Sequence, residues 1–193
     1  MRIIGGKWRS RTLIQPHTDE TRPMPDRVKA ALFSMLGSHF DCPGELPPIR
    51  VADAFAGSGS MGLEALSRGA AACYFYERGT AALKALRENL EKLQAGPEAT
   101  IVSRDAWRAA ALGPDGRPFE LILLDPPYRH SRDASALGDV RKFLARIATQ
   151  DGNRPVVVLH HPARVEYPLS DDDPWRILDH RCLGSNGLTT FVR

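Results

Sequence analysis

The sequence predicts one α/β domain built on a doubly wound, mostly parallel sheet of seven strands. Its 193 residues suffice for one well-buried domain, and 42% hydrophobic and 25% charged residues are ordinary for a globular protein. Between residues 49 and 160, apolar segments of strand length alternate with segments of helical periodicity, which is typical of parallel strands joined by helices. A glycine-rich turn after the first strand fits the same class.

Residues 1–40 are predicted to form a small basic extension of this domain. We expect a hairpin of residues 2–5 and 10–14, followed by an amphipathic helix that Asp26 caps and Gly37 ends. Residues 1–29 hold seven Lys and Arg against three acidic residues, in a chain with formal net charge +3. This asymmetry favours a polyanionic partner, although a solvated arm without a partner is the alternative. The candidate contacts are Lys7, Arg9, Arg11, Arg22 and Arg27.

Residues 41–193 are predicted to hold the sheet and its helices. Strands are expected at residues 49–54, 72–76, 99–103, 120–124 and 156–160. Helices are expected at 61–68, 80–94, near 107–111, and at 134–148. A closing hairpin of residues 176–183 and 188–192 would turn at Gly184-Ser185-Asn186-Gly187.

The turn after the first predicted strand has the spacing of a nucleoside-cofactor site. Gly57, Gly59 and Gly62 form the pattern G-x-G-x-x-G between a strand and a helix. Glu77 closes the second strand 20 residues after Gly57, where a carboxylate can accept from ribose hydroxyls. Nicotinamide dinucleotides and S-adenosylmethionine both use this topology. Asp53 at the strand end favours a cofactor with an α-amino group over one with a pyrophosphate.

Four acidic residues end predicted strands: Asp53, Glu77, Asp105 and Asp125. Ligands of such sheets bind beyond the carboxyl ends of the strands, so we expect these side chains to lie around one site. Asp105 could accept from an adenine amino group, or it could cap the short helix that follows it. The sequence therefore predicts that Asp125 is a neighbour of the cofactor.

The segment Asp125-Pro126-Pro127-Tyr128 follows the apolar strand at residues 121–124. Two prolines remove backbone donors and fix an extended backbone, which leaves acceptors beside an aromatic ring. The exocyclic amine of a nucleobase would match this turn through hydrogen bonds and stacking. The alternative is a strand exit stiffened by prolines, with a surface tyrosine.

These motifs resemble those of S-adenosylmethionine-dependent amino-group methyltransferases. Three further segments, Thr21-Arg22-Pro23, residues 26–33 (DRVKAALF) and residues 62–70 (GLEALSRGA), resemble the RsmD-like 16S ribosomal RNA guanine-N2 methyltransferases. The resemblance implies a Rossmann-like methyltransferase domain, S-adenosylmethionine as cofactor, and 16S ribosomal RNA as partner, free or in a partly assembled small subunit. It implies catalytic roles for Asp125, Pro126, Pro127 and Tyr128, and cofactor contacts at Asp53, Phe55, Ala56, Gly57, Gly59, Glu77, Arg78, Asp105 and Ala106.

The sequence departs from that family pattern at two places. Met24 stands where the family usually has threonine, and Asn186-Gly187 stands where it has Tyr-Gly. We expect the first to affect contacts near the substrate or cofactor, and the second to alter only the closing hairpin.

Other functions remain open from the residues alone. An N6-adenine or protein-glutamine methyltransferase could present an amine to the same turn. A nicotinamide-dependent oxidoreductase would leave the Asp125 turn without a role. A non-catalytic RNA-binding module would explain the basic segment but not the glycine turn with Glu77.

The sequence also predicts several absences. His160 and His161 have no third ligand near them in sequence, so we expect packing or surface roles and no metal. The three cysteines, Cys42, Cys73 and Cys182, form no C-x-x-C pair and predict no disulfide framework. No apolar segment reaches the length of a membrane span and the first residues lack a secretory signal, so we expect a cytoplasmic monomer.

Overall fold

The sheet has seven strands, as the sequence predicts, in the order β3-β2-β1-β4-β5-β7-β6. The structure is a computed structural model that describes residues 1–16, 24–109, 112–126, 134–148, 154–167, 169 and 172–193. The strands are β1 (Arg50–Ala54), β2 (Ala72–Tyr76), β3 (Ala99–Val102), β4 (Leu121–Leu124), β5 (Val156–Pro162), β6 (Arg176–Leu183) and β7 (Asn186–Val192).

Strands β3, β2, β1, β4 and β5 are parallel, whereas β7 pairs antiparallel with both β5 and β6. The closing hairpin therefore does not add its strands in sequence order, because β7 lies between β5 and β6. Its turn is shorter than predicted, since β7 begins at Asn186 rather than at residue 188. This insertion brings the beginning of β7 beside the carboxyl end of β5, where Pro162 pairs with Asn186.

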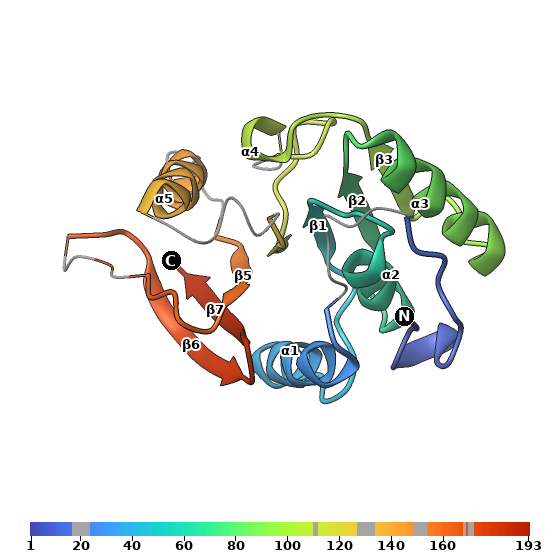
Figure 1. Ribbon diagram of the computed structural model, residues 1–193, viewed down its shortest axis with the longest axis horizontal. Coiled ribbons are helices and arrows are strands. Elements are labelled where there is room, and N and C mark those ends of the chain that lie inside the picture. Colours follow the sequence, from blue (N-terminus) through green and yellow to red (C-terminus); the bar gives the residue numbers. More distant parts are fainter. Residues whose placement is uncertain (17–23, 110–111, 127–133, 149–153, 168, 170–171) are drawn as a thin grey trace.

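Two apolar clusters cover the two faces of the sheet. On one face the strands pack against α1 (Asp26–His39), α2 (Ser60–Ser67) and α3 (Thr80–Leu93). On the other face they pack against α4 (Ala106–Ala109) and α5 (Ala134–Ala148). Figure 1 shows these helices on the two sides of the sheet. Consecutive β4 residues alternate between the clusters, which is why the whole strand is apolar.

The N-terminal segment is held against α2 and α3. The predicted hairpin is reduced to one antiparallel bridge, between Arg2 and Thr12, around the short 3-10 helix η1 (Gly6–Trp8). Ile3 and Leu13 are buried in the core beside α1 and α2. These contacts place residues 1–16 on the same core as the sheet, so the division of the chain at residue 40 stays a prediction.

Side chains of α2 and α3 anchor the backbone of this segment. Glu64 accepts from the N–H of Ile4 at 2.8 Å. Asn89, fully buried on α3, accepts from the N–H of Ile14 at 2.7 Å and donates to the carbonyls of Ile14 and Ser58, each at 2.9 Å. Since Ser58 belongs to the glycine-rich turn, Asn89 links the N-terminal segment to the predicted cofactor loop.

Helix α1 corrects two expectations. Asp26 is the first helical residue and not the cap, because Pro25 occupies the capping position and the Asp26 carboxylate accepts from Arg2. Gly37 does not end the helix, which continues to His39. Gly37 is buried, and a Cβ there would collide with the carbonyl of Cys42. The glycine therefore permits close packing of the following loop.

Among the described residues, no helix has both the length and the apolar composition that crossing a bilayer requires.

Candidate functional site

The predicted site residues gather at the carboxyl ends of the central strands. Ala54 at the end of β1 pairs with Tyr76 of β2 on one side and with Leu124 of β4 on the other. The residues that follow these strands therefore leave the sheet side by side. The N–H of Asp125 also approaches the carbonyl of Ala54 at 3.4 Å. Asp53, Glu77 and Asp125 thus share one edge, as the strand order requires.

The glycine-rich turn has different requirements at each glycine. Gly57 has φ +57° and open space where a Cβ would point. Gly59 has φ +85° and would drive a Cβ into the Leu86 side chain. Gly62 allows α2 to pack on the sheet, because a Cβ there would meet Phe75, Cys73 and Asp53. Only Gly57 leaves free space, as expected where a ligand approaches the backbone.

Asp53 is a buried carboxylate with one oxygen still lacking a partner. Its Oδ2 accepts from the N–H of Gly62 at 2.8 Å, while its Oδ1 has no hydrogen-bond partner among the described residues. Burial raises the pKa of Asp53 to about 7, the Gly62 hydrogen bond opposes this shift, and the charges of Asp125 and Glu77 add to it. A buried acceptor without a donor is rare, so this oxygen fits a cationic or donating group of a ligand.

Glu77 braces the turns around the site. One oxygen accepts from the N–H of Gly57 at 2.9 Å, and the other accepts from the N–H groups of Arg78 and Gly79, each at 2.7 Å. These bonds hold the glycine loop against the end of β2. Each carboxylate oxygen can accept more than one bond, so the predicted contact with ribose hydroxyls stays open.

The two roles weighed for Asp105 are resolved in part. Its Oδ1 accepts from the N–H of Trp107 at 2.9 Å, which is the capping role. Its Oδ2 lies 3.3 Å from the exposed guanidinium of Arg78, another predicted cofactor residue. Ala106, also predicted at this site, is buried. A contact between Asp105 and an adenine amine stays a prediction.

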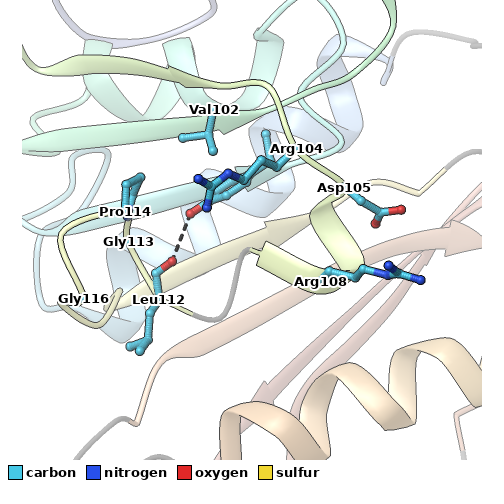
Figure 2. A pocket seen from close by; sticks show the side chains of 9 residues that line it. Val102, Arg104, Asp105, Arg108, Leu112, Gly113, Pro114 and Gly116 are labelled. Carbon is cyan, nitrogen blue, oxygen red and sulfur yellow. Dashed lines mark hydrogen bonds between the residues drawn. The ribbon is translucent and has the colours of Figure 1, made fainter.

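A cavity of about 590 Å³ lies beside the ends of β2 and β3 (Figure 2). Among the predicted cofactor residues, Asp105 borders it. The Tyr76 hydroxyl donates to the carbonyl of Leu112 at 3.1 Å across its floor. Figure 2 shows the Arg104 side chain reaching toward Leu112, while Asp105 and Arg108 point away from that loop. The cavity thus adjoins the shared edge without containing Asp53 or Asp125.

Phe55 adopts a left-handed backbone, with φ +66°, where β1 enters the glycine loop. This conformation costs a non-glycine residue about 1–2 kcal/mol. The Phe55 ring packs edge-on against Trp107 with ring centroids 4.9 Å apart, and Trp107 in turn contacts Phe143. This packing of Phe55, Trp107 and Phe143 holds the strained turn. Ala56 follows Phe55 and is buried.

Asp125 is paired with His160, for which the sequence predicts only packing or surface roles. Its Oδ1 lies 2.8 Å from Nδ1 of His160, and Nε2 of His160 lies 3.0 Å from Oδ1 of Asn186. The Asp125 side chain is 32% exposed, whereas that of His160 is 4% exposed. Pro126 is buried. The remaining predicted catalytic residues, Pro127 and Tyr128, lie outside the described residues.

Asn186 therefore does more than shape the closing hairpin, and that expectation was wrong. It is separated from Asp125 by one side chain, because β7 is inserted beside β5. The available sequence signal was that His160 and Asn186 are polar residues at the ends of apolar segments. Met24, the other departure, is buried in the core beside α1 and contributes packing.

The candidate RNA-contacting residues differ in whether they already form ion pairs within the protein. Lys7 pairs with Glu98 at 3.2 Å. Arg9, Arg11 and Arg27 are exposed and form no ion pair within the described part of the chain. Arg22 lies outside the described residues. The structure thus offers three arginines to a polyanion.

The predicted cofactor residues and the partly exposed carboxylate of Asp125 lie at the same edge of the sheet. Asp53 and the glycine loop offer an acceptor and an open backbone, which suit a nucleoside cofactor carrying an α-amino group. Asp125 offers an acceptor close enough for its charge to act on Asp53. Over the described ranges, no cluster of three or more His, Cys, Asp or Glu side chains could hold a metal ion.

Comparisons with known proteins agree with this geometry. "Putative rRNA methyltransferase YlbH" of Bacillus subtilis is 35% identical over 174 residues, covering 90% of this chain and 89% of that protein. "Ribosomal RNA small subunit methyltransferase D" of Escherichia coli is 40% identical over 129 residues, covering 67% of this chain and 61% of that protein.

Solved structures give the same result. A putative methyltransferase, yhhF from Escherichia coli, superposes with a TM-score of 0.73 at 27% identity, covering 100% of this chain and 97% of the other. A putative methylase from Haemophilus influenzae has a TM-score of 0.71 at 26% identity, with the same coverage. The family model "Conserved hypothetical protein 95" matches residues 1–192. The chain therefore belongs to this family, the RsmD-like family of methyltransferases.

Proposed function

We propose that this protein transfers a methyl group from S-adenosylmethionine to the exocyclic N2 amine of a guanine in 16S ribosomal RNA. The observation that carries the proposal is the position of Asp125, a partly exposed carboxylate beside the glycine loop and the buried Asp53. The names of two relatives, a ribosomal RNA small subunit methyltransferase and a putative rRNA methyltransferase, support the substrate class.

The residues of the cofactor edge would act by binding and orientation. The unpartnered Oδ1 of Asp53 would accept from the α-amino group, directly or through a water molecule. Glu77 would accept from ribose hydroxyls while it keeps its bond to Gly57, and Arg78, Asp105 and Ala106 would border the adenine. Bound S-adenosylmethionine supplies an electrophilic methyl group.

Asp125 would act on the amine of the target base. Its Oδ1 is occupied by His160, so its Oδ2 is the oxygen available to accept an N–H of the amine. The carbonyl of Pro126 could accept the second N–H, which would draw the nitrogen lone pair out of conjugation and aim it. Positioning and electrostatics therefore supply most of the catalysis. The carboxylate could also take the proton that the nitrogen releases.

The base must leave its stack to reach this carboxylate, and single-stranded RNA loops permit this at least cost. We assign the stacking contact to Tyr128 and the phosphate contacts to Arg9, Arg11, Arg22 and Arg27. Lys7 contributes less in this proposal, because Glu98 already neutralises it. We also propose that the enzyme acts as a cytoplasmic monomer without a metal.

The decisive experiment incubates the protein and methyl-labelled S-adenosylmethionine with naked 16S RNA and with immature small-subunit particles. We expect N2-methylguanosine after digestion to nucleosides. Label in N6-methyladenosine would instead support the adenine alternative. Absence of label from both substrates would sink the proposal. Preference for the particles would identify the partly assembled subunit as the substrate.

The basic surface can be tested with matched substitutions. Arg9→Gln and Arg11→Gln should each weaken RNA binding and reduce the slope of log K against log salt by about 0.7 to 0.9. Arg176→Gln is the control, because Arg176 is an exposed arginine on β6, at the opposite end of the sheet from η1. Equal effects of all three changes would contradict the proposed surface.

A further inference from the structure

The contacts of Asn186 determine how it faces His160. Its amide nitrogen lies 3.4 Å from the carbonyl of Leu183, which can only accept. The amide oxygen is therefore the atom that faces Nε2 of His160, at 3.0 Å. Since an amide oxygen can only accept, Nε2 must carry a proton.

The other ring nitrogen of His160 also faces an acceptor. Nδ1 lies 2.8 Å from Oδ1 of Asp125. One further proton must lie between these two atoms, or two lone pairs would face each other. A carboxylic acid is a much stronger acid than an imidazolium, so this proton belongs on the ring. Both nitrogens of His160 then donate, and the ring is an imidazolium beside a carboxylate.

We propose that His160, doubly protonated and held between Asp125 and Asn186, is a positioning residue that fixes the orientation of the Asp125 carboxylate. Oδ1 is thereby occupied, and Oδ2 is presented to the amine of the substrate. The inference concerns one residue that directly follows β4 and one residue each on β5 and β7, and it rests on the proposed function only where methyl transfer is measured.

The surroundings of His160 favour its charged form. Burial lowers the pKa of His160, but the charge of Asp125 and the hydrogen bonds to Asp125 and Asn186 outweigh burial and raise it. The neighbouring His161 faces Thr189 and the carbonyl of Pro162, and burial lowers its pKa to about 4. His161 is therefore neutral near pH 7 and does not oppose the charge on His160. Within the part of the chain that the structure describes, Asp125 and His161 are the charged or titratable groups that act on His160.

This pair has a pH dependence with a definite sign. Because the folded protein favours the protonated ring, the ion pair is present below the raised pKa of His160 wherever the carboxylate is ionised, and it is lost as pH rises through that pKa. Loss of the proton frees the Asp125 side chain to rotate. Methyl transfer should therefore have an alkaline limb that reports on His160.

Two nearly isosteric changes at Asn186 test the pair in opposite directions. Asn186→Asp places a carboxylate against Nε2 and should move the titration of His160, followed by NMR of its ring in the full-length protein, to higher pH. Asn186→Leu removes the acceptor and should move it to lower pH. Asp125→Asn should also move it to lower pH. These titrations need neither RNA nor cofactor.

In the Asn186 variants, the alkaline limb of the methylation rate should shift in the same direction as the His160 titration. His160→Gln should lower kcat about 100-fold, the order expected for a misplaced catalytic group, and leave KM for RNA largely unchanged. His161→Gln is the matched control, because it removes the adjacent buried histidine and should leave the alkaline limb in place.

The outcomes separate the two proposals. If both Asn186 substitutions move the His160 titration in the same direction, or Asp125→Asn leaves it unchanged, the positioning role is wrong, whatever the enzyme methylates. If the titrations move as expected but ribosomal RNA receives no label, the pair is real and the proposed function is wrong.

Discussion

Two carboxylates at neighbouring strand ends, Asp53 near the carboxyl end of β1 and Asp125 directly after β4, have opposite surroundings. Asp53 is 1% exposed, receives one backbone N–H, and has a pKa raised to about 7, first of all by burial. Asp125 is 32% exposed and lies against a histidine whose charged form is favoured. Asp125 has a cationic partner in His160, whereas Asp53 has none among the described residues. In the proposed function, Asp53 therefore binds the cationic amino group of the cofactor, and Asp125 acts on the amine of the substrate.

The largest effect should come from removing the reacting carboxylate. Asp125→Ala should lower kcat by about 1000-fold, within the range for a lost acid–base group, because the amine then lacks its acceptor. Cofactor affinity, measured by calorimetry, should persist because Asp53 and the glycine loop are untouched. Near-normal turnover of the Asp125→Ala variant would contradict the role of Asp125 in the reaction.

Removing the buried charge should give the second largest effect, on cofactor affinity. Asp53→Asn should weaken S-adenosylmethionine by about 10- to 100-fold at pH 8, the equivalent of one charge-assisted hydrogen bond. In the wild-type protein, affinity should fall as pH decreases through about 7, because Asp53 takes up a proton. The substituted protein should lose this pH dependence, and calorimetry across pH 6–8 would show whether it does.

The glycines around Asp53 should separate stability from binding. Gly62→Ala should destabilise the fold by about 1–3 kcal/mol, because its Cβ meets Phe75 and Cys73. Gly57→Ala should cost roughly 1–2 kcal/mol for its positive φ and should also reduce cofactor affinity, since its Cβ points into open space. Denaturant unfolding and calorimetry on both variants make the comparison. If Gly57→Ala and Gly62→Ala reduce cofactor affinity equally, the cofactor does not occupy the open space at Gly57.

A further effect, on stability and not on activity, should be the contribution of Asp53 to stability against pH. The folded state binds its proton more tightly than the unfolded chain, so stability falls as pH rises from about 4 to about 7. The slope from this one group is at most about 1.4 kcal/mol per pH unit. Asp53→Asn should remove it, so the variant should gain stability relative to wild type as pH rises to 7. A constant difference between the two unfolding curves would contradict the raised pKa.

Sequence reasoning found the parallel part of the fold because each of its strands is a local apolar segment followed by a helical one. It also located the glycine loop, Glu77 and Asp125, since all of them follow from strand ends. It misplaced the cap and the end of α1, because Gly37 is explained by a loop packed on it and not by its own conformation.

The partner of Asp125 could not be found in this way. His160 is 35 residues from Asp125 and Asn186 is 26 residues from His160. Their contact depends on β7 entering between β5 and β6, which is a matter of strand order and not of local pattern. The unpartnered oxygen of Asp53 likewise depends on burial, which spacing alone does not reveal.

The position of β7 also sets an order of assembly during translation. Domains tend to fold from the N-terminus as they leave the ribosome, and β1, β2 and β4 emerge before β7. A nascent chain released after β5 would carry the glycine loop, Asp53 and Asp125 but would lack Asn186. Because Asn186 faces Nε2 of His160 and His160 faces Asp125, the held form of the Asp125 carboxylate is complete only after β7 has been synthesised.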